Sequence, residues 1–325
     1  MANSKHLELN DSFELEDIMA SFSQTEYVSL TVMFLFVGFI SLVGNIATII
    51  LFCKNKTLWK KFYATLISLT VSDVIGGCIS LNTGFKLVAG EDVFKDANSL
   101  ISLWLLMFPS FTSQCHMVLM SVERYLAVVH PLVHMKYYTK KSAAVSVGVT
   151  WVASVLLTFL TTIISAVKFG SRGEVNVVNI ATSKLNSITV SLVDLIIYLF
   201  NCIFIVSLYT HIIYRIKNVK SSQALCSQEV VAPLAKKQKC VLMTCSLIGY
   251  FILTWTPFVV SKVFAVMTND LDVYKLVPYF AILGYTNFAN NHVIFVALNP
   301  TIWEIFKKSL CCFKNTKCIT SAVSR

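Results

Sequence analysis

A carboxylate and several amides stand inside long apolar stretches of this sequence. Asp73 lies in the middle of such a stretch, where a charge costs roughly 2.5–3.5 kcal/mol even on a lenient membrane-insertion scale. It must therefore face other protein segments, and polar residues at comparable depth elsewhere could join it in one buried cluster. These residues are Asn45, Ser113, Asn287, Asn290 and Asn291.

A second polar group, Glu123-Arg124-Tyr125, ends the third apolar stretch. A buried arginine beside an acid can be held in an ion pair and released to meet a partner when the pair loosens. The alternative is a surface group whose charged ends simply extend to water at the end of a helix.

Neither group suggests catalysis. Of the six histidines, only His116, His211 and His292 fall in or near apolar stretches, and they form no metal-ligand pattern or nucleophile and base pair. An intramembrane hydrolase is therefore disfavoured, and we expect no enzyme. A transporter or channel is the alternative function, but it would need polar residues along a continuous path, whereas these cluster at mid-depth and at one end.

The elements that position these residues are membrane-spanning helices. Hydrophobic residues make up 56% of the 325 and charged residues 14%, far from the roughly 25% charged content of soluble domains. Runs of about 20 apolar residues match the thickness of a bilayer, and lipid requires them to be helical. Seven such runs are found, near 28–53, 63–88, 99–122, 143–166, 187–214, 238–267 and 275–298.

Charge asymmetry predicts the orientation. Basic residues concentrate in the first, third and fifth connections and in the tail, which should lie in the cytoplasm. The acidic first segment should be extracellular, with Asn10 as a glycosylation acceptor in Asn10-Asp11-Ser12. The net charge of +10 is thus a topology signal, and we expect no nucleic-acid partner. The predicted location is the plasma membrane.

Four regions are expected along the chain. They are an extracellular tail over 1–27, a seven-helix bundle over 28–298, a short amphipathic helix over 299–313 on the inner membrane surface, and a cytoplasmic tail over 314–325. Loops should be short, the longest near 167–186 and 215–237. Cys311 and Cys312 would be palmitoylated or remain unmodified. None of the ten cysteines falls in an outer loop, so packing alone should hold the outer face together.

The segment from Ser121 to Leu132, with its Glu123-Arg124-Tyr125, closely resembles the signature of rhodopsin-like (class A) G-protein-coupled receptors. The other spans resemble that family's markers in order. These are Gly44-Asn45, the run Ser68 to Asp73, Trp151, Tyr209, the run Phe251 to Pro257, and Asn291-His292-Val293-Ile294-Phe295. The resemblance covers about residues 27–312. It implies an all-α membrane protein that passes an extracellular signal to a heterotrimeric G protein, with an arrestin as a second partner.

The resemblance also assigns roles. Asp73, Ser113, Asn287 and Asn291 match the family's sodium-binding pocket, so a sodium ion is expected as an allosteric modulator and no other cofactor. Activation-switch positions and G-protein-coupling positions follow in the same way. The switch comprises Phe251, Trp255, Pro257, Asn291 and Phe295, and coupling involves Glu123, Arg124, Tyr125 and Tyr209.

Three departures from the family pattern affect the transduction path. His292 and Phe295 replace a proline and a tyrosine, which removes a kink and a hydroxyl from the seventh helix. Lys237 stands where some members carry an acid that locks the arginine, so we expect signalling without ligand. Asn201 and Gln114 replace apolar residues, and we expect their amides to hydrogen-bond to each other.

The ligand is constrained mainly by exclusion. Leu106 replaces the aspartate of amine receptors, and Tyr285 replaces the retinal-binding lysine of opsins. Asp194 and Lys262 would either pair and neutralise each other or leave a lysine for a carboxylate or phosphate. A weak likeness to prostaglandin E receptors favours a lipid or a small acidic molecule, and a peptide is the alternative. Pocket candidates are Lys86, Trp104, Leu106, Asp194, Lys262 and Tyr285.

Overall fold

The computed structural model describes residues 21–55, 63–90, 99–167, 184–223, 228–299 and 301–307. Within those ranges the chain forms helices and no strand. The helices are α2 (Gln24–Lys54), α3 (Ala64–Val88), α4 (Ser99–Val129), α5 (Pro131–Tyr137), α6 (Lys140–Val167), α8 (Lys184–Gln223), α9 (Gln228–Thr268) and α10 (Leu271–Leu298).

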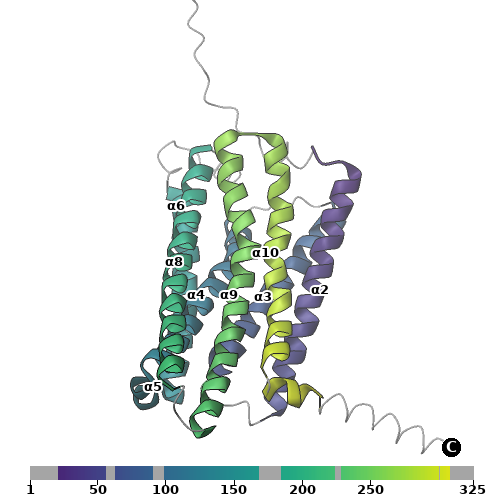
Figure 1. Ribbon diagram of the computed structural model, residues 1–325. Helices are drawn as coiled ribbons and strands as arrows, with labels where there is room; N and C mark the ends of the chain where they lie inside the picture. Colours follow the sequence, from purple (N-terminus) through teal and green to yellow (C-terminus); the bar gives the residue numbers. More distant parts are fainter. Residues whose placement is uncertain are drawn as a thin grey trace, which may run out of the picture.

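Seven long helices stand side by side in one bundle (Figure 1). Among the described residues, five of them, α2, α3, α6, α8 and α9, are long and apolar enough to cross a bilayer. The other two, α4 and α10, complete the bundle: α4 packs on α6 and α8, and α10 packs on α9 and α2. The predicted fold class, an all-α membrane protein with seven spanning helices, is confirmed.

The bundle is apolar outside and polar inside. Large apolar side chains point outward, among them Phe36, Phe200 and Leu253, which are 64%, 69% and 69% exposed. Asn45 and Asp73, in contrast, are fully buried. Water would not tolerate such a surface, whereas lipid does, and polar contacts between helices then hold the bundle together.

Helix α2 begins slightly earlier than expected, because its first turn forms a capping box. The Glu26 amide donates to Ser23 Oγ at 3.3 Å, and the Ser23 amide donates to Glu26 Oε2 at 2.8 Å. The two reciprocal bonds satisfy amides that a helix start otherwise leaves open. Gln24 to Tyr27 are therefore helical rather than part of the tail expected over 1–27.

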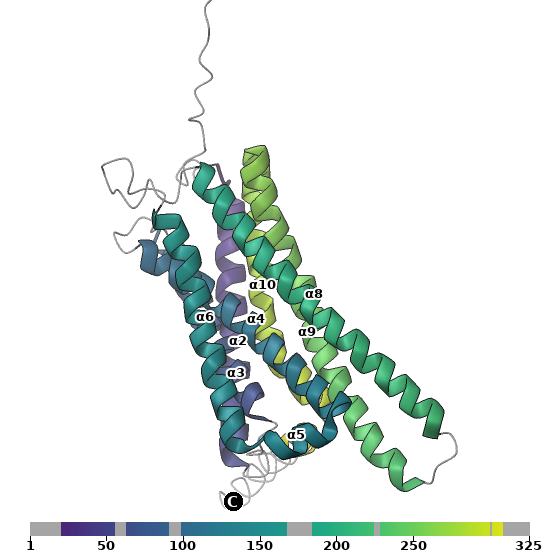
Figure 2. The same ribbon diagram turned by 90° about the vertical axis from the view of Figure 1, so that its left-hand side faces the viewer.

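The long inner loop expected near 215–237 is wrong. Helix α8 continues to Gln223 and α9 begins at Gln228, so both helices extend beyond the rest of the bundle (Figure 2). No glycine or proline occurs between Arg215 and Val230 to end them. The fall in hydropathy at this point marks the membrane boundary and not the end of a helix.

Two short helices lie at the same end of the bundle. Helix α5, which was not predicted, starts with Pro131 in its first turn, a position that suits the fixed φ of proline. Residues 301–307 form the described part of the helix expected over 299–313, at the foot of α10 (Figure 1). Ile302 on it is fully buried.

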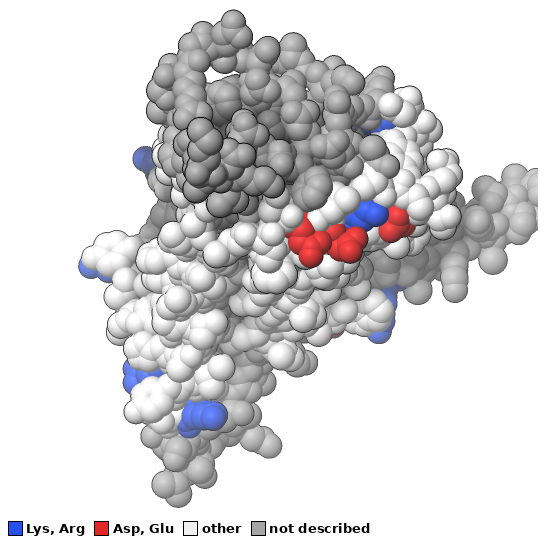
Figure 3. Space-filling model, turned by 90° about the horizontal axis from the view of Figure 1, so that it is seen from above, with Lys and Arg blue, Asp and Glu red and all other residues white. Residues whose placement is uncertain are grey.

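The opposite end, where α9 meets α10, carries acidic side chains near a basic one on an otherwise largely uncharged described surface (Figure 3). Acidic residues there cap or open helices: Glu26 in the first turn of α2, and Asp270 and Asp272 at the start of α10. Negative charge near a helix start is stabilised by the helix dipole.

Candidate functional site

Hydrogen bonds to Glu123 tie the last turns of α4 to α3 and to the connection between α5 and α6. Its Oε1 accepts from Thr65 Oγ1 of α3 at 2.6 Å and from the Tyr138 hydroxyl, which lies between α5 and α6. Glu123 and Arg124 are each only 5% exposed. The pair is therefore buried inside the bundle and is not a surface group reaching for water.

Tyr138 was missed by the sequence analysis, because a tyrosine in a connection gives no signal of its partner. Burial, followed by the neighbouring Glu123 carboxylate, raises the pKa of Tyr138 well above its usual range. Its hydroxyl consequently stays protonated and keeps donating to Glu123.

Tyr125 and Tyr209 connect this site to α8. The Tyr125 hydroxyl lies 3.3 Å from His211 Nδ1, and the two rings are 5.5 Å apart. Tyr209 is buried two residues before His211. All four positions assigned to G-protein coupling thus lie at the inner end of α4 and on the adjoining stretch of α8.

Trp255 lies at the centre of an aromatic cluster in the middle of the bundle. It contacts Phe258 at 5.7 Å and Phe288 at 6.0 Å between ring centroids, and Phe251 at 6.3 Å. Gly284 of α10 makes room for the indole, since a Cβ there would lie 2.9 Å from its Cε3. The structure thus packs α9 and α10 against each other through the predicted switch residue.

Pro257 follows Trp255 two residues later within α9. Proline removes one backbone hydrogen bond from a helix interior and weakens the helix locally. Pro257 is therefore a point of α9 beside Trp255 at which this backbone hydrogen bond is missing.

Below this cluster, α3 and α10 meet at Asp73. Asn291 donates from Nδ2 to Asp73 Oδ2 at 3.0 Å, and Ser113 donates to Asn287 Oδ1 at 3.3 Å. Asn45 donates from its Nδ2 to the Phe288 carbonyl at 2.8 Å and so ties α2 to α10. Five of the six residues expected in one buried polar cluster are thus buried, on four helices, whereas Asn290 is only partly buried and bonds to Tyr250 of α9 instead.

The cluster is incompletely satisfied by protein groups. Asp73 Oδ1, Asn291 Oδ1 and Ser72 Oγ are buried without a hydrogen-bond partner. Native proteins rarely leave buried oxygens in this condition without a reason. Carboxylate, hydroxyl and amide oxygens are the kinds of ligand that a hard cation takes, so the chemistry of these residues fits sodium.

The two departures in α10 are accommodated by close packing. The His292 ring lies directly against Gly44 of α2, where a Cβ would come within 2.0 Å of the ring. Phe295 is fully buried. The hydroxyl that the family pattern has at position 295 is replaced here by an apolar core contact.

Asn201 and Gln114 hydrogen-bond to each other, as predicted. Asn201 Nδ2 donates to Gln114 Oε1 at 3.0 Å and joins α8 to α4. A similar link, not predicted, joins α9 to α10: Asn290 donates to the Tyr250 hydroxyl, which lies 2.9 Å from Thr286 Oγ1. Sequence could have suggested it only through Asn290, an amide at mid-span.

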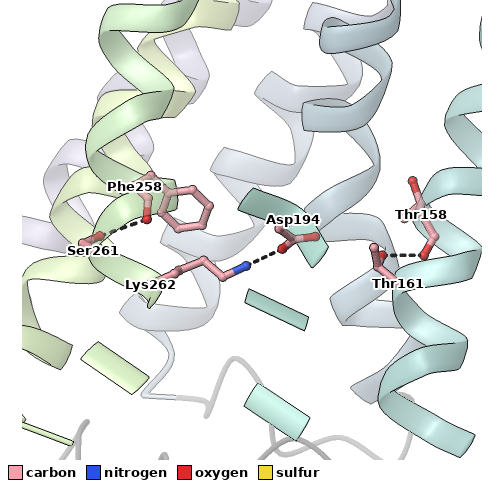
Figure 4. Close-up of polar contacts among 6 residues, drawn as sticks. All are labelled: Thr158, Thr161, Asp194, Phe258, Ser261 and Lys262. Atoms are coloured by element: carbon pink, nitrogen blue, oxygen red, sulfur yellow. Dashed lines mark hydrogen bonds and ion pairs between the residues drawn. The ribbon is translucent and has the colours of Figure 1, made fainter. Parts of the chain in front are cut away.

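In the outer half of the bundle, Lys262 of α9 and Asp194 of α8 form an ion pair, with Nζ 2.6 Å from Oδ2 (Figure 4). The structure thus realises the alternative in which the two charges pair. Tyr285 is a core residue, 4% exposed and packed edge-on to Phe34 and Phe288. Lys86 lies partly buried in the last turn of α3.

Several predicted positions cannot be placed. The side chains of Trp104, Leu106 and Lys237 lie outside the described residues, as do Asn10, Cys311 and Cys312 entirely.

Comparison with known proteins gives a consistent result. The model of the family described as "7 transmembrane receptor (rhodopsin family)" matches residues 44–295. The human (Homo sapiens) histamine H2 receptor is 23% identical over 296 residues, covering 88% of this chain and 80% of the relative. The 5-hydroxytryptamine receptor 4 of Cavia porcellus is 23% identical over 320 residues, covering 90% and 81%.

A shorter match has a higher sequence identity. The muscarinic acetylcholine receptor M3 of Rattus norvegicus is 32% identical over 124 residues, which cover 38% of this chain and 21% of the relative. These relatives are receptors and not enzymes, in agreement with the absence of a catalytic pattern among the residues considered above.

Proposed function

The chain belongs to the rhodopsin family of seven-transmembrane receptors, and we propose that it transmits ligand binding to a G protein by an outward movement of the inner half of α9. As a G-protein-coupled receptor it is a multi-pass membrane protein with a heterotrimeric G protein as partner. The burial of Glu123 and Arg124 near the end of α4 is the observation that carries the proposal, because a buried arginine needs a moving element to become accessible.

The moving element is the part of α9 below Pro257. When ligand shifts Trp255, the hinge allows the inner half of α9 to leave Tyr209 and Arg124. These two residues, with Glu123 and Tyr125, then line a crevice for the helical tail of the G protein. Phe251, Asn291 and Phe295 would repack as α9 and α10 separate.

The resting state is held differently from that of receptors with an acid on α9. A lysine at position 237 cannot form the acid–arginine lock, whereas Glu123 accepts hydrogen bonds from Thr65 and Tyr138. A receptor that lacks this lock should signal measurably without ligand.

A sodium ion is the proposed modulator. Asp73, Ser113, Asn287 and Asn291 would hold it, and the unpartnered Asp73 Oδ1 and Asn291 Oδ1 support this assignment. The ion supplies positive charge that compensates the buried carboxylate, and it stabilises the packing of α3 against α10 in the resting state.

The ligand is proposed to be a lipid, a small acidic molecule or a peptide. The relatives carry the names of amine receptors, but position 106 is leucine where amine receptors have an aspartate. Of the pocket candidates, Asp194 is neutralised by Lys262. A simple amine would therefore have to displace a lysine.

The orientation of the chain, its modifications and its second partner belong to the same proposal. The amino terminus lies outside the plasma membrane with a glycan at Asn10. Cys311 and Cys312 carry palmitate on the inner side, and an arrestin binds the activated form.

Nucleotide exchange tests the proposal. The purified receptor in lipid nanodiscs should accelerate GTP uptake by at least one heterotrimer from a panel of the G-protein classes. Arg124→Leu should abolish the acceleration while leaving the thermal unfolding of the receptor near that of the parent. If no heterotrimer responds to the parent receptor with or without candidate ligands, the proposal is wrong.

A further inference from the structure

The Asp194–Lys262 pair is the most unusual charged feature of the outer half of the bundle. The Lys262 and Asp194 side chains are 19% and 12% exposed, and they join α8 to α9 across a single contact of 2.6 Å. Buried Thr158 and Thr161 of α6 flank Asp194 on the other side (Figure 4). The pair is thus largely, but not completely, buried.

Both side chains of the pair can form further hydrogen bonds. Asp194 Oδ1 is buried without a hydrogen-bond partner, so the carboxylate can accept a further donor. The Lys262 ammonium has three donors, one of which Asp194 engages, and it lies 5.4 Å from the centre of the Phe258 ring. The ring face stabilises a cation while leaving its other N–H groups available.

Charge balance then selects the ligand. A singly charged ligand that enters the contact pairs with one side chain and leaves the other as an uncompensated, poorly hydrated charge, which is strongly unfavourable. A molecule with both an ammonium and a carboxylate compensates both, with its ammonium on Asp194 and its carboxylate on Lys262. No net charge is buried in the exchange.

Resting on the proposed receptor function, but with a ligand class other than the lipid, acid or peptide named there, we propose that the Asp194–Lys262 pair is the recognition site for a small zwitterion of the amino acid class, which inserts between the two side chains. The insertion separates α8 from α9 at this point. Lys262 contacts Phe258, and Phe258 packs edge-on to Trp255 at 5.7 Å. Displacement of Lys262 is thereby transmitted through two ring contacts to the residue beside the α9 hinge.

The first test is direct binding to the full-length purified receptor, without any G protein. The probes are the free amino acids together with 4-aminobutanoate, each assayed by thermal shift and by isothermal titration. Butylammonium and butanoate are the matched probes that carry one charge each. At least one zwitterion should bind, and the singly charged probes should bind at least about thirtyfold more weakly, as expected when one member of a buried charge pair is left alone.

Variants then assign the binding to the pair. Asp194→Asn and Lys262→Met should each weaken zwitterion binding by about thirtyfold or more. The exchanged pair Asp194→Lys with Lys262→Asp should recover part of the affinity, because the zwitterion can bind in the reverse direction. Asp272→Asn and Lys275→Met are matched controls on α10, the latter because Lys275 also lies over a phenylalanine ring, and they should bind normally.

The outcomes separate the two proposals. If no zwitterion binds, or if binding survives Lys262→Met unchanged, the zwitterion site is wrong, whether or not the receptor drives nucleotide exchange. If a zwitterion binds with the predicted pattern but no G protein responds, the site stands and the proposed transduction fails. If the single variants unfold, the double variant Asp194→Asn with Lys262→Met replaces them, because it leaves no unpaired charge. It should fold without binding the zwitterion, and binding by this variant would reject the site.

Discussion

Asn201 on α8 donates a hydrogen bond from its Nδ2 to Gln114 Oε1 on α4, over 3.0 Å. Gln114 is buried and Asn201 is partly buried, so each amide is withdrawn from water and finds its partner in the other. The contact restrains how α8 is rotated against α4. It therefore also restrains the directions in which Asp194 and Tyr209, on the same helix, point.

The first prediction concerns this contact. Asn201→Leu and Gln114→Leu should each lower receptor stability by about 1–2 kcal/mol, because each leaves one amide without a partner. The double variant should be more stable than the sum of the two losses predicts. Thermal unfolding in one detergent measures all four proteins, and strictly additive losses would show that the two amides do not depend on each other.

The second prediction concerns Tyr250, whose hydroxyl joins α9 to Asn290 and Thr286 on α10. Tyr250→Phe removes this link and should favour separation of the two helices. Loss of a single hydrogen bond shifts such an equilibrium about two- to tenfold, and Tyr250→Phe removes two, so ligand-independent GTP exchange should rise by at least that factor. Tyr214→Phe is the control, since Tyr214 is 61% exposed on α8. Equal GTP exchange by the parent and Tyr250→Phe would show that the Tyr250 link does not hold α9 against α10.

The third prediction concerns Tyr138 and pH. Tyr138→Phe deprives Glu123 of one donor and should also raise ligand-independent exchange. Because the pKa of Tyr138 is raised in the folded receptor, its stabilising contact is present below the ordinary tyrosine pKa of about 10 and is lost only at higher, strongly alkaline pH. The difference between variant and parent should thus stay constant from about pH 6.5 to 8.5. A difference that vanishes within this window would contradict the assigned hydrogen bond.

The fourth prediction concerns sodium. Replacing choline chloride by sodium chloride at constant ionic strength should lower ligand-independent exchange of the parent receptor. Asp73→Asn removes the carboxylate that holds the ion and should make exchange insensitive to the replacement. Ser80→Ala is a control elsewhere on α3, because Ser80 donates to the Phe34 carbonyl away from Asp73. An undiminished sodium response in Asp73→Asn would exclude the site.

Much of the fold and of the transduction site could be predicted from the sequence. Length and hydropathy located the seven helices, because lipid allows few alternatives for an apolar run. Asp73 and Arg124 could be identified because they are charged residues in or at the end of apolar stretches. The Asn201–Gln114 bond followed from the same rule applied to amides.

Two kinds of feature could not be predicted, because hydropathy does not report them: the hydrogen-bond partners of tyrosines and the ends of helices outside the membrane. Tyr138 and Tyr250 are amphipathic residues whose hydroxyl partners are set by helix packing, so neither stood out. The extensions of α8 and α9 beyond the membrane were missed because their polar residues look like a loop. Whether Asp194 and Lys262 pair depends on the rotation of two helices, and sequence leaves that rotation open.

The central claim is that the inner half of α9 moves away from α4 when a G protein engages. Its most direct test is the distance between spin labels at Leu242 on α9 and Val133 on α5, both exposed positions near the inner end, measured by double electron–electron resonance in nanodiscs. Nucleotide-free heterotrimer should add a population at longer distance, and the Arg124→Leu variant should lack it. A distribution that stays unchanged while the same preparation catalyses GTP exchange would contradict the account.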